Sequence, residues 1–175
     1  MRKHALIVGA PGVGKSTLID RVLEELGCPV WGFETKKETD GEPAEEGFPV
    51  YLYQLGRERR RTEENLVGRC RKKCICIRPE AFDRYAGELK KPVPAGHAVK
   101  MDELGFLEAS SRAFCEAVLE KLDGDAPVIA AVKNRDIPFL QAVRSHPRGE
   151  IFFITEENRE ELFGQVLAFM REQMK

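Results

Sequence analysis

The chain has 175 residues, enough for one domain with a substantial core, and its 28 basic and 29 acidic residues give a formal net charge of −1. This balance excludes a polycation that would bind nucleic acid through overall charge. No apolar run approaches the ~20 residues that span a bilayer, so we expect no membrane partner. The first apolar run begins at His4 and leaves no room for a signal peptide, so we expect a cytoplasmic protein.

The first predicted elements enclose a glycine-rich segment. Residues 4–8 are an apolar run typical of a buried strand, and residues 15–26 carry apolar side chains at helical spacing. Between them, residues 9–17 read Gly-Ala-Pro-Gly-Val-Gly-Lys-Ser-Thr. This matches the phosphate-loop pattern G-x-x-x-x-G-K-[ST] at every fixed position. Because motif, strand and helix agree, we interpret the segment as a nucleotide-phosphate loop and not as a chance match.

The residue types in this loop suit phosphate chemistry. Glycine has no Cβ, so the backbone can bend and approach a phosphate, and the N–H groups at a helix start attract anions. Lys15 is expected to reach the β- and γ-phosphates as a catalytic residue, Ser16 to bind Mg²⁺, and Thr17 to bond the α-phosphate. The expected nucleotide-binding residues are Gly9, Ala10, Pro11, Gly12, Val13, Gly14, Lys15, Ser16 and Thr17.

The segment 29–78 is predicted to be rich in strands and almost without helix. Its expected elements are strands at 29–34, 48–53 and 73–77, a polar turn at 35–47, and a charged loop at 56–65. We interpret the segment as an antiparallel insertion within a single domain, 1–175. The loop contains Arg57, Arg59, Arg60 and Arg61, which fit a solvated loop but also a flexible lid, an interface or an RNA-facing patch.

The cysteines do not suggest a metal site. The chain contains Cys28, Cys70, Cys74, Cys76 and Cys115. An odd number in a cytoplasmic chain argues against a disulfide framework. The spacing C-x-x-x-C-x-C fits no standard zinc pattern, and the alternation over residues 74–77 favours packing of a strand.

The second half of the chain alternates between helices and strands. Helices are predicted at 79–88, 106–121, 136–145 and 157–173, and strands at 97–101, 127–132 and 150–154. This alternation predicts an α/β fold with a mostly parallel sheet covered by helices on both faces. Thr155 is the expected N-cap of the last helix.

An acidic pair follows the strand predicted at 97–101. Asp102 and Glu103 would lie at the carboxyl edge of the sheet, where ligands bind in open α/β folds. Asp102 is the candidate for holding Mg²⁺, and Glu103 for activating water as a general base. The alternative is a surface pair that caps the following helix. Lys100 supports that alternative, because it interrupts an otherwise apolar strand and needs a carboxylate partner or a route to solvent.

Several segments of the chain, in the same order, resemble the P-loop nucleoside-triphosphatase family that includes the human cancer-related nucleoside-triphosphatase and its thermophile relatives. The matching pieces are residues 9–17, Gly32-Phe33-x-Thr35, Asp102-Glu103-Leu104-Gly105-x-Leu107-Glu108 and Phe152-x-x-Thr155-x-x-Asn158-Arg159. The resemblance implies a RecA-like core and slow, Mg²⁺-dependent hydrolysis of ATP, GTP and other NTPs. It also implies the metal role of Asp102 and the catalytic role of Glu103. Lys100 and the segment 133–139 depart from the family pattern.

Three functions remain open from the sequence. The first is an NTP hydrolase, in which Lys133 or Arg135 either contacts the γ-phosphate or lies in a solvated loop. The second is a nucleotide or small-molecule kinase with the arginine run as its lid. The third is a nucleotide-dependent switch with an RNA or protein partner.

Overall fold

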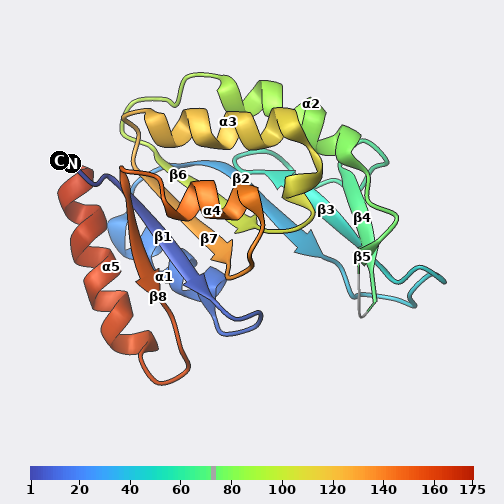
Figure 1. Ribbon diagram of the computed structural model, residues 1–175, viewed down its shortest axis with the longest axis horizontal. Helices are drawn as coiled ribbons and strands as arrows, with labels where there is room; N and C mark the ends of the chain where they lie inside the picture. Colours follow the sequence, from blue (N-terminus) through green and yellow to red (C-terminus); the bar gives the residue numbers. More distant parts are fainter. Residues whose placement is uncertain (72–73) are drawn as a thin grey trace.

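The computed structural model describes residues 1–71 and 74–175 and is built on one mixed sheet. The strand order is β5-β4-β3-β2-β6-β7-β1-β8 (Figure 1). The strands are β1 (His4–Gly9), β2 (Val30–Lys37), β3 (Phe48–Gln54), β4 (Leu66–Cys70), β5 (Cys74–Ile75), β6 (Ala98–Leu104), β7 (Val128–Lys133) and β8 (Gly149–Phe153).

The parallel part of the sheet runs β2-β6-β7-β1-β8. β7 lies between β1 and β6, so the strand before the glycine-rich loop and the strand with the acidic pair are not neighbours. The arrowheads of β1, β7 and β8 point to the same edge in Figure 1. All the loops that follow parallel strands therefore meet at this edge.

β3, β4 and β5 extend the sheet with antiparallel pairing. The antiparallel insertion is therefore confirmed, but three of its details were wrong. β2 pairs in parallel with β6 and belongs to the central sheet. β4 was not predicted, because Gly68 interrupts its short apolar run. The strand expected at 73–77 is β5, with only two residues, and position 73 lies outside the described residues.

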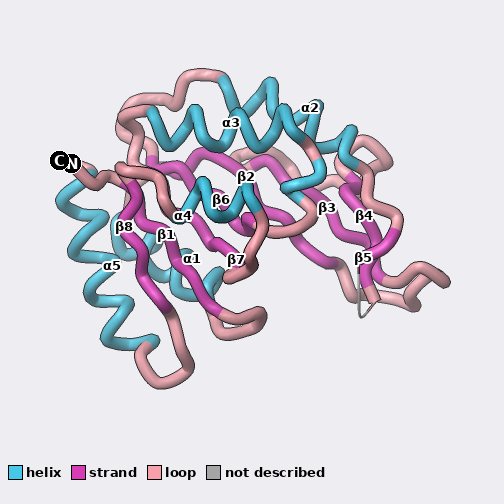
Figure 2. Tube along the Cα trace, viewed as in Figure 1, coloured by secondary structure: helices cyan, strands magenta, loops and turns pink. Residues whose placement is uncertain are grey.

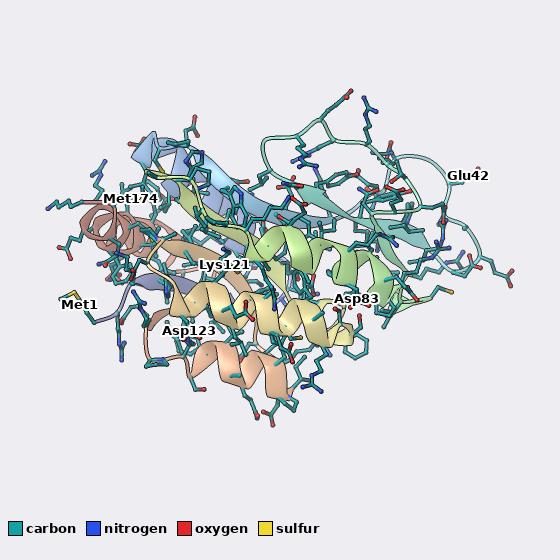
Figure 3. All side chains as sticks on the ribbon, turned by 90° about the horizontal axis from the view of Figure 1, so that it is seen from above. Met1, Glu42, Asp83, Lys121, Asp123 and Met174 are labelled. Atoms are coloured by element: carbon teal, nitrogen blue, oxygen red, sulfur yellow. The ribbon has the colours of Figure 1, made fainter. Side chains whose placement is uncertain are left out.

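Helices cover both faces of the sheet, as predicted (Figure 2). They are α1 (Lys15–Leu26), α2 (Pro79–Lys90), α3 (Arg112–Asp123), α4 (Pro138–Arg144), α5 (Arg159–Gln173) and the 3₁₀ turn η1 (Glu108–Ser110). α2, α3 and α4 lie side by side on one face, as the view from above shows (Figure 3), while α1 and α5 pack together on the other. The first core contains Phe33, Phe82 and Phe114, and the second contains Ile19, Val22 and Val166.

Three helices start later than predicted: α4 begins at Pro138, and at α3 and α5 polar side chains reorganise the preceding turns. α3 begins at Arg112, since the Ser111 hydroxyl accepts a bond of 3.1 Å from the Phe114 N–H and ends the preceding η1 turn. Thr155 is not the N-cap of α5. The N-cap is Asn158. Asn158 Oδ1 accepts from the Thr155 N–H at 2.8 Å and so holds the connection from β8.

The cysteines differ from expectation in one respect. Cys70 is disulfide-bonded, although the odd number of cysteines argued against a disulfide framework, while Cys28, Cys76 and Cys115 are free thiols. Cys76 has a positive φ of 57° and is exposed, so the predicted alternation does not continue through it. The side chains of Cys74 and Ile75 lie outside the described residues. Within the described part of the chain, no helix has the length and apolar character that a bilayer crossing needs.

Candidate active site

The glycine-rich loop joins β1 to α1 in a conformation that needs glycine. Gly12 and Gly14 have φ values of 74° and 104°, in the left-handed region. A Cβ on Gly9 would lie 2.7 Å from Cγ2 of Ile154, so the chain after β8 can pass this close only to glycine. No acidic side chain occupies the first turn of α1, and no side chain caps it. Its N–H groups are therefore open to an anion.

Lys15 is folded over this loop. Its side chain is buried, and its ammonium donates to the carbonyl oxygens of Gly9 at 3.0 Å and Ala10 at 2.7 Å. Burial lowers the pKa of Lys15 below its usual value, and the nearby Glu103 carboxylate opposes this effect. A phosphate oxygen would be a stronger, charged acceptor than these neutral carbonyls.

Ser16 and Asp102 meet across the sheet edge. The Ser16 hydroxyl donates to Oδ1 of Asp102 at 2.8 Å. Burial raises the pKa of Asp102, while the hydrogen bond from Ser16 and the charge of Lys100 act in the opposite direction. A hydroxyl and a single carboxylate are the kind of hard oxygen donors that bind Mg²⁺ together with substrate phosphates and water. The two residues therefore fit a Mg²⁺ ion.

Glu103 lies at an irregularity in the strand. The register between β6 and β7 shifts between Asp102 and Leu104, so Glu103 is the extra residue of a bulge. Such a bulge re-aims a side chain that would otherwise alternate with its neighbour. Glu103 consequently borders the same cavity as the phosphate loop. This cavity of about 350 Å³ is lined by Pro11, Gly12, Gly14, Lys15, Ser16, Thr17, Glu103, Ala131 and Lys133.

Lys100 has the carboxylate partners that the sequence required. Its ammonium lies 2.7 Å from Asp20, 3.2 Å from Glu34 and 3.4 Å from Asp102, and the side chain is only 6% exposed. It therefore interrupts the apolar strand without leaving a buried charge unpaired. The β6 backbone here faces Gly32, where a Cβ would lie 2.1 Å from the Lys100 carbonyl oxygen. Only glycine fits at that position.

Glu108 supports the turn that follows Glu103. Its buried carboxylate accepts from the Gly105 N–H at 2.9 Å. Burial raises the pKa of Glu108 to about 7, and the charge of Glu103 adds to this while Lys133 opposes it. The Thr35 hydroxyl lies near enough to lower this pKa but makes no hydrogen bond of ordinary length and angle. Glu108 thus fixes the backbone beside the acidic pair.

Three nearby basic residues differ in position. Lys133 ends β7 and pairs with Glu103 at 2.8 Å, a contact that the sequence did not predict. Arg135 is exposed and lies outside the cavity lining. Arg159 was noted only within the family resemblance, yet its Nε lies 3.6 Å from where a Cβ on Gly14 would be. Its place at the start of α5, directly after the last strand, is the signal that could have pointed to it.

The arginine loop is paired with carboxylates of the same chain. The pairs join Arg57 with Glu88, Arg59 with Glu34, Arg60 with Glu58, and Arg61 with Glu38 and Asp40. Each of these arginines therefore has a carboxylate partner within the chain. Glu34 contacts both Arg59 and Lys100, so the loop is connected to the charged groups beside Asp102.

Comparison with known proteins decides the family. A family model described as NTPase matches residues 4–167. The chain belongs to the NTPase family. This confirms the P-loop nucleoside-triphosphatase resemblance, and with it the expected enzyme class.

Relatives of this NTPase family member are similar along almost their entire length. "Nucleoside-triphosphatase THEP1" of Methanocaldococcus jannaschii is 33% identical over 170 residues, which cover 92% of this chain and 93% of the relative. "Cancer-related nucleoside-triphosphatase" of Homo sapiens is 27% identical over 191 residues, and the match covers 100% of this chain and 100% of the relative.

Solved structures confirm the P-loop NTPase-like fold of this family member. The crystal structure of THEP1 from Aquifex aeolicus has a TM-score of 0.68 at 24% identity and covers 95% of this chain and 98% of that one. The solution structure of a human cancer-related nucleoside triphosphatase gives a TM-score of 0.68 over 97% of this chain and 98% of that one.

Proposed function

We propose that the protein is a Mg²⁺-dependent enzyme that hydrolyses ATP, GTP and other NTPs to the diphosphate and phosphate. The observation that carries the proposal is the 2.8 Å hydrogen bond between Ser16 and Asp102, with Glu103 lining the same cavity as the phosphate loop. The names of the relatives, which are nucleoside-triphosphatases, support the reaction class. We further propose that the chain acts as one domain in the cytoplasm.

Binding is assigned to the loop and the start of α1. The open N–H groups of residues 9–17 would hold the phosphates, and Lys15 would exchange its two carbonyl partners for β- and γ-phosphate oxygens. Ser16 and Asp102 would hold Mg²⁺, which when bound neutralises phosphate charge and orients the triphosphate.

Hydrolysis is assigned to Glu103. The oxygen of a water molecule attacks the γ-phosphorus, and the bond from that phosphorus to the β–γ bridging oxygen breaks with its electron pair leaving on the diphosphate. The water proton passes to the Glu103 carboxylate and then to phosphate or solvent. Lys15 and the α1 amides stabilise the charge that spreads over the phosphoryl oxygens.

The test is phosphate release from each NTP with Mg²⁺, measured under single-turnover conditions. Glu103→Gln should lower the rate by about 10²–10⁴-fold with NTP affinity retained, since general-base catalysis contributes that much. Lys15→Ala should lose binding, and the exposed control Glu172→Gln should match the parent. A Glu103→Gln rate equal to that of the parent would show that Glu103 is not the base.

The same assay separates the other candidate functions. A nucleoside, nucleotide or sugar that raises turnover far above the rate with water alone would make the protein a kinase. Failure of every NTP to turn over, together with RNA or protein binding that depends on a nonhydrolysable NTP, would make it a switch.

A further inference from the structure

The two oxygens of the Asp102 carboxylate have different partners. Oδ1 accepts the hydrogen bond from Ser16 at 2.8 Å, while Oδ2 lies 3.4 Å from the Lys100 ammonium. Lys100 and Asp102 stand two positions apart in β6, so their side chains lie on the same face of the sheet. Both side chains are buried. Lys100 therefore leaves Oδ1 as the oxygen that serves a metal beside Ser16.

We infer that Lys100 sets the metal preference of the site: its ammonium occupies Oδ2, so that Asp102 binds a divalent cation through one oxygen and not through both. Lys100 is thus a positioning residue that acts through Asp102. This inference rests on the proposed metal role of Asp102, and it names the kind of cation that the NTP brings to the site.

Two further carboxylates hold Lys100 in place. Its ammonium donates to Asp20 on α1 at 2.7 Å and to Glu34 on β2 at 3.2 Å. Glu34 is itself paired with Arg59 and lies in register with Asp102 on the neighbouring strand. Movement of the ammonium away from Asp102 would break these contacts and leave buried charge without a partner. The ammonium therefore stays beside Oδ2 when a metal binds at Oδ1.

Mg²⁺ and Ca²⁺ use a carboxylate differently. Mg²⁺ requires near-octahedral geometry and keeps several waters, so one oxygen of Asp102, the Ser16 hydroxyl and phosphate oxygens satisfy it. Ca²⁺ takes roughly six to eight oxygen ligands and accepts both oxygens of one carboxylate. With Oδ2 occupied by Lys100, Ca²⁺ loses a ligand that Mg²⁺ does not need. The site should therefore favour NTP with Mg²⁺ over NTP with Ca²⁺.

Binding measurements in different metals test the inference without hydrolysis. We would determine by calorimetry the affinity for a nonhydrolysable NTP in Mg²⁺, in Ca²⁺ and in EDTA. The parent should bind more tightly in Mg²⁺ than in Ca²⁺. Lys100→Met should narrow this ratio of affinities at least about tenfold, the lower end expected when a group that orients a metal ligand is lost. The metal preference of the nucleotide itself cancels, because every protein is measured with the same NTP.

Two controls separate the orientation of Asp102 from other effects of the substitution. Lys90→Met removes an exposed ammonium paired with Glu120 and should keep the ratio of the parent. In the Asp102→Asn background, Lys100→Met should leave the ratio within about twofold, because an asparagine side chain has a single oxygen for a metal whether or not Lys100 is present.

A third pair of variants keeps the test available if Lys100→Met does not fold. Glu34→Gln removes one of the carboxylates that Lys100 neutralises, so the double variant Lys100→Met/Glu34→Gln is then compared with Glu34→Gln alone. The same narrowing of at least about tenfold is expected from this comparison.

An unchanged ratio without Lys100, an equal narrowing in the Asp102→Asn background, or a metal-dependent parent that does not distinguish Mg²⁺ from Ca²⁺ would overturn the inference. Lys100 would then be a structural partner of Asp20 and Glu34. Failure of the proposed function gives other results. Equal NTP affinity of the parent in Mg²⁺, Ca²⁺ and EDTA would reject the metal role of Asp102 and the inference with it. The expected narrowing in a protein that hydrolyses no NTP would uphold the inference and reject the hydrolase.

Discussion

The Ser16 hydroxyl donates a 2.8 Å hydrogen bond to Asp102, which lies 86 positions later in the chain. The bond joins the first turn of α1 to β6 across the intervening strand β7. Both candidate metal ligands are thus assembled in the protein alone. A metal that arrives with NTP would meet oxygen donors that are already in place.

Asp102→Asn should weaken the Mg²⁺-dependent part of NTP binding. The amide keeps the shape of the carboxylate but removes the charge that a hard cation prefers. We expect NTP affinity to fall at least about tenfold in Mg²⁺ and little in EDTA, as measured by calorimetry with a nonhydrolysable NTP. An equal fall in both conditions would show that Asp102 acts on the fold and not on the metal.

Lys100→Met should destabilise the protein. The substitution leaves the buried Asp102 carboxylate without its ammonium and leaves the partly buried Glu34 with Arg59 as its remaining partner; removal of one partner from a buried ion pair costs about 3–5 kcal/mol. Urea unfolding should show this loss, and Glu34→Gln added to Lys100→Met should recover part of it. Stability equal to that of the parent would show that solvent already screens these charges. Lys90→Met is again the exposed control.

Because His4 is buried in its neutral form, the free energy of unfolding should fall in mild acid. The imidazole is fully buried, its Nε2 donates to the Leu122 carbonyl oxygen at 2.8 Å, and its Nδ1 accepts from the Val128 N–H at 3.2 Å. Burial lowers the pKa of His4 from 6.5 to about 4. Because the unfolded chain binds the proton more readily, the contribution of His4 is complete above pH 6.5 and is lost as the pH falls to 4.

The loss from His4 amounts to about 3 kcal/mol. Unfolding measured at pH 7 and pH 4 should show this loss of stability in the parent and in the control variant His97→Asn. The loss should be absent from His4→Asn. An equal pH dependence in all three proteins would contradict the neutral, buried state of His4.

The contribution of Glu108 to stability should depend on pH in the opposite direction to that of His4, and Glu108→Gln should remove it. Burial raises the pKa of Glu108 from 4.5 to about 7, so the folded protein holds this proton more tightly than the unfolded chain. The contribution of Glu108 is complete below pH 4.5 and is lost as the pH rises through 7. A glutamine oxygen can still accept from the Gly105 N–H. The variant should therefore gain stability relative to the parent between pH 5 and pH 8, and a constant difference across this range would contradict the prediction.

Much of the site could be predicted because its signals are local. Residues 9–17 define their own backbone: the glycines permit the bend, and the helix from Lys15 to Leu26 begins and ends at the predicted residues. The acidic pair was recognisable because it comes at the end of a mostly apolar run and so lies at the carboxyl edge of a parallel sheet, although β6 continues through the pair to Leu104 instead of ending at 101. β4 was missed because its five residues include a glycine and give too short a pattern.

The sequence by itself determined the phosphate loop, the alternation of strands and helices, and the residue types of the acidic pair, since each depends on neighbours within a few positions. Only the tertiary structure decided where Glu103 points, because its bulge arises from a mismatch of register between β6 and β7. It also decided that Lys100 lies among three carboxylates and that Lys133 pairs with Glu103. Ion pairs depend on distances through space, and apart from Asp102, two positions from Lys100, these partners lie 30 to 80 positions apart and approach one another only when the sheet has formed.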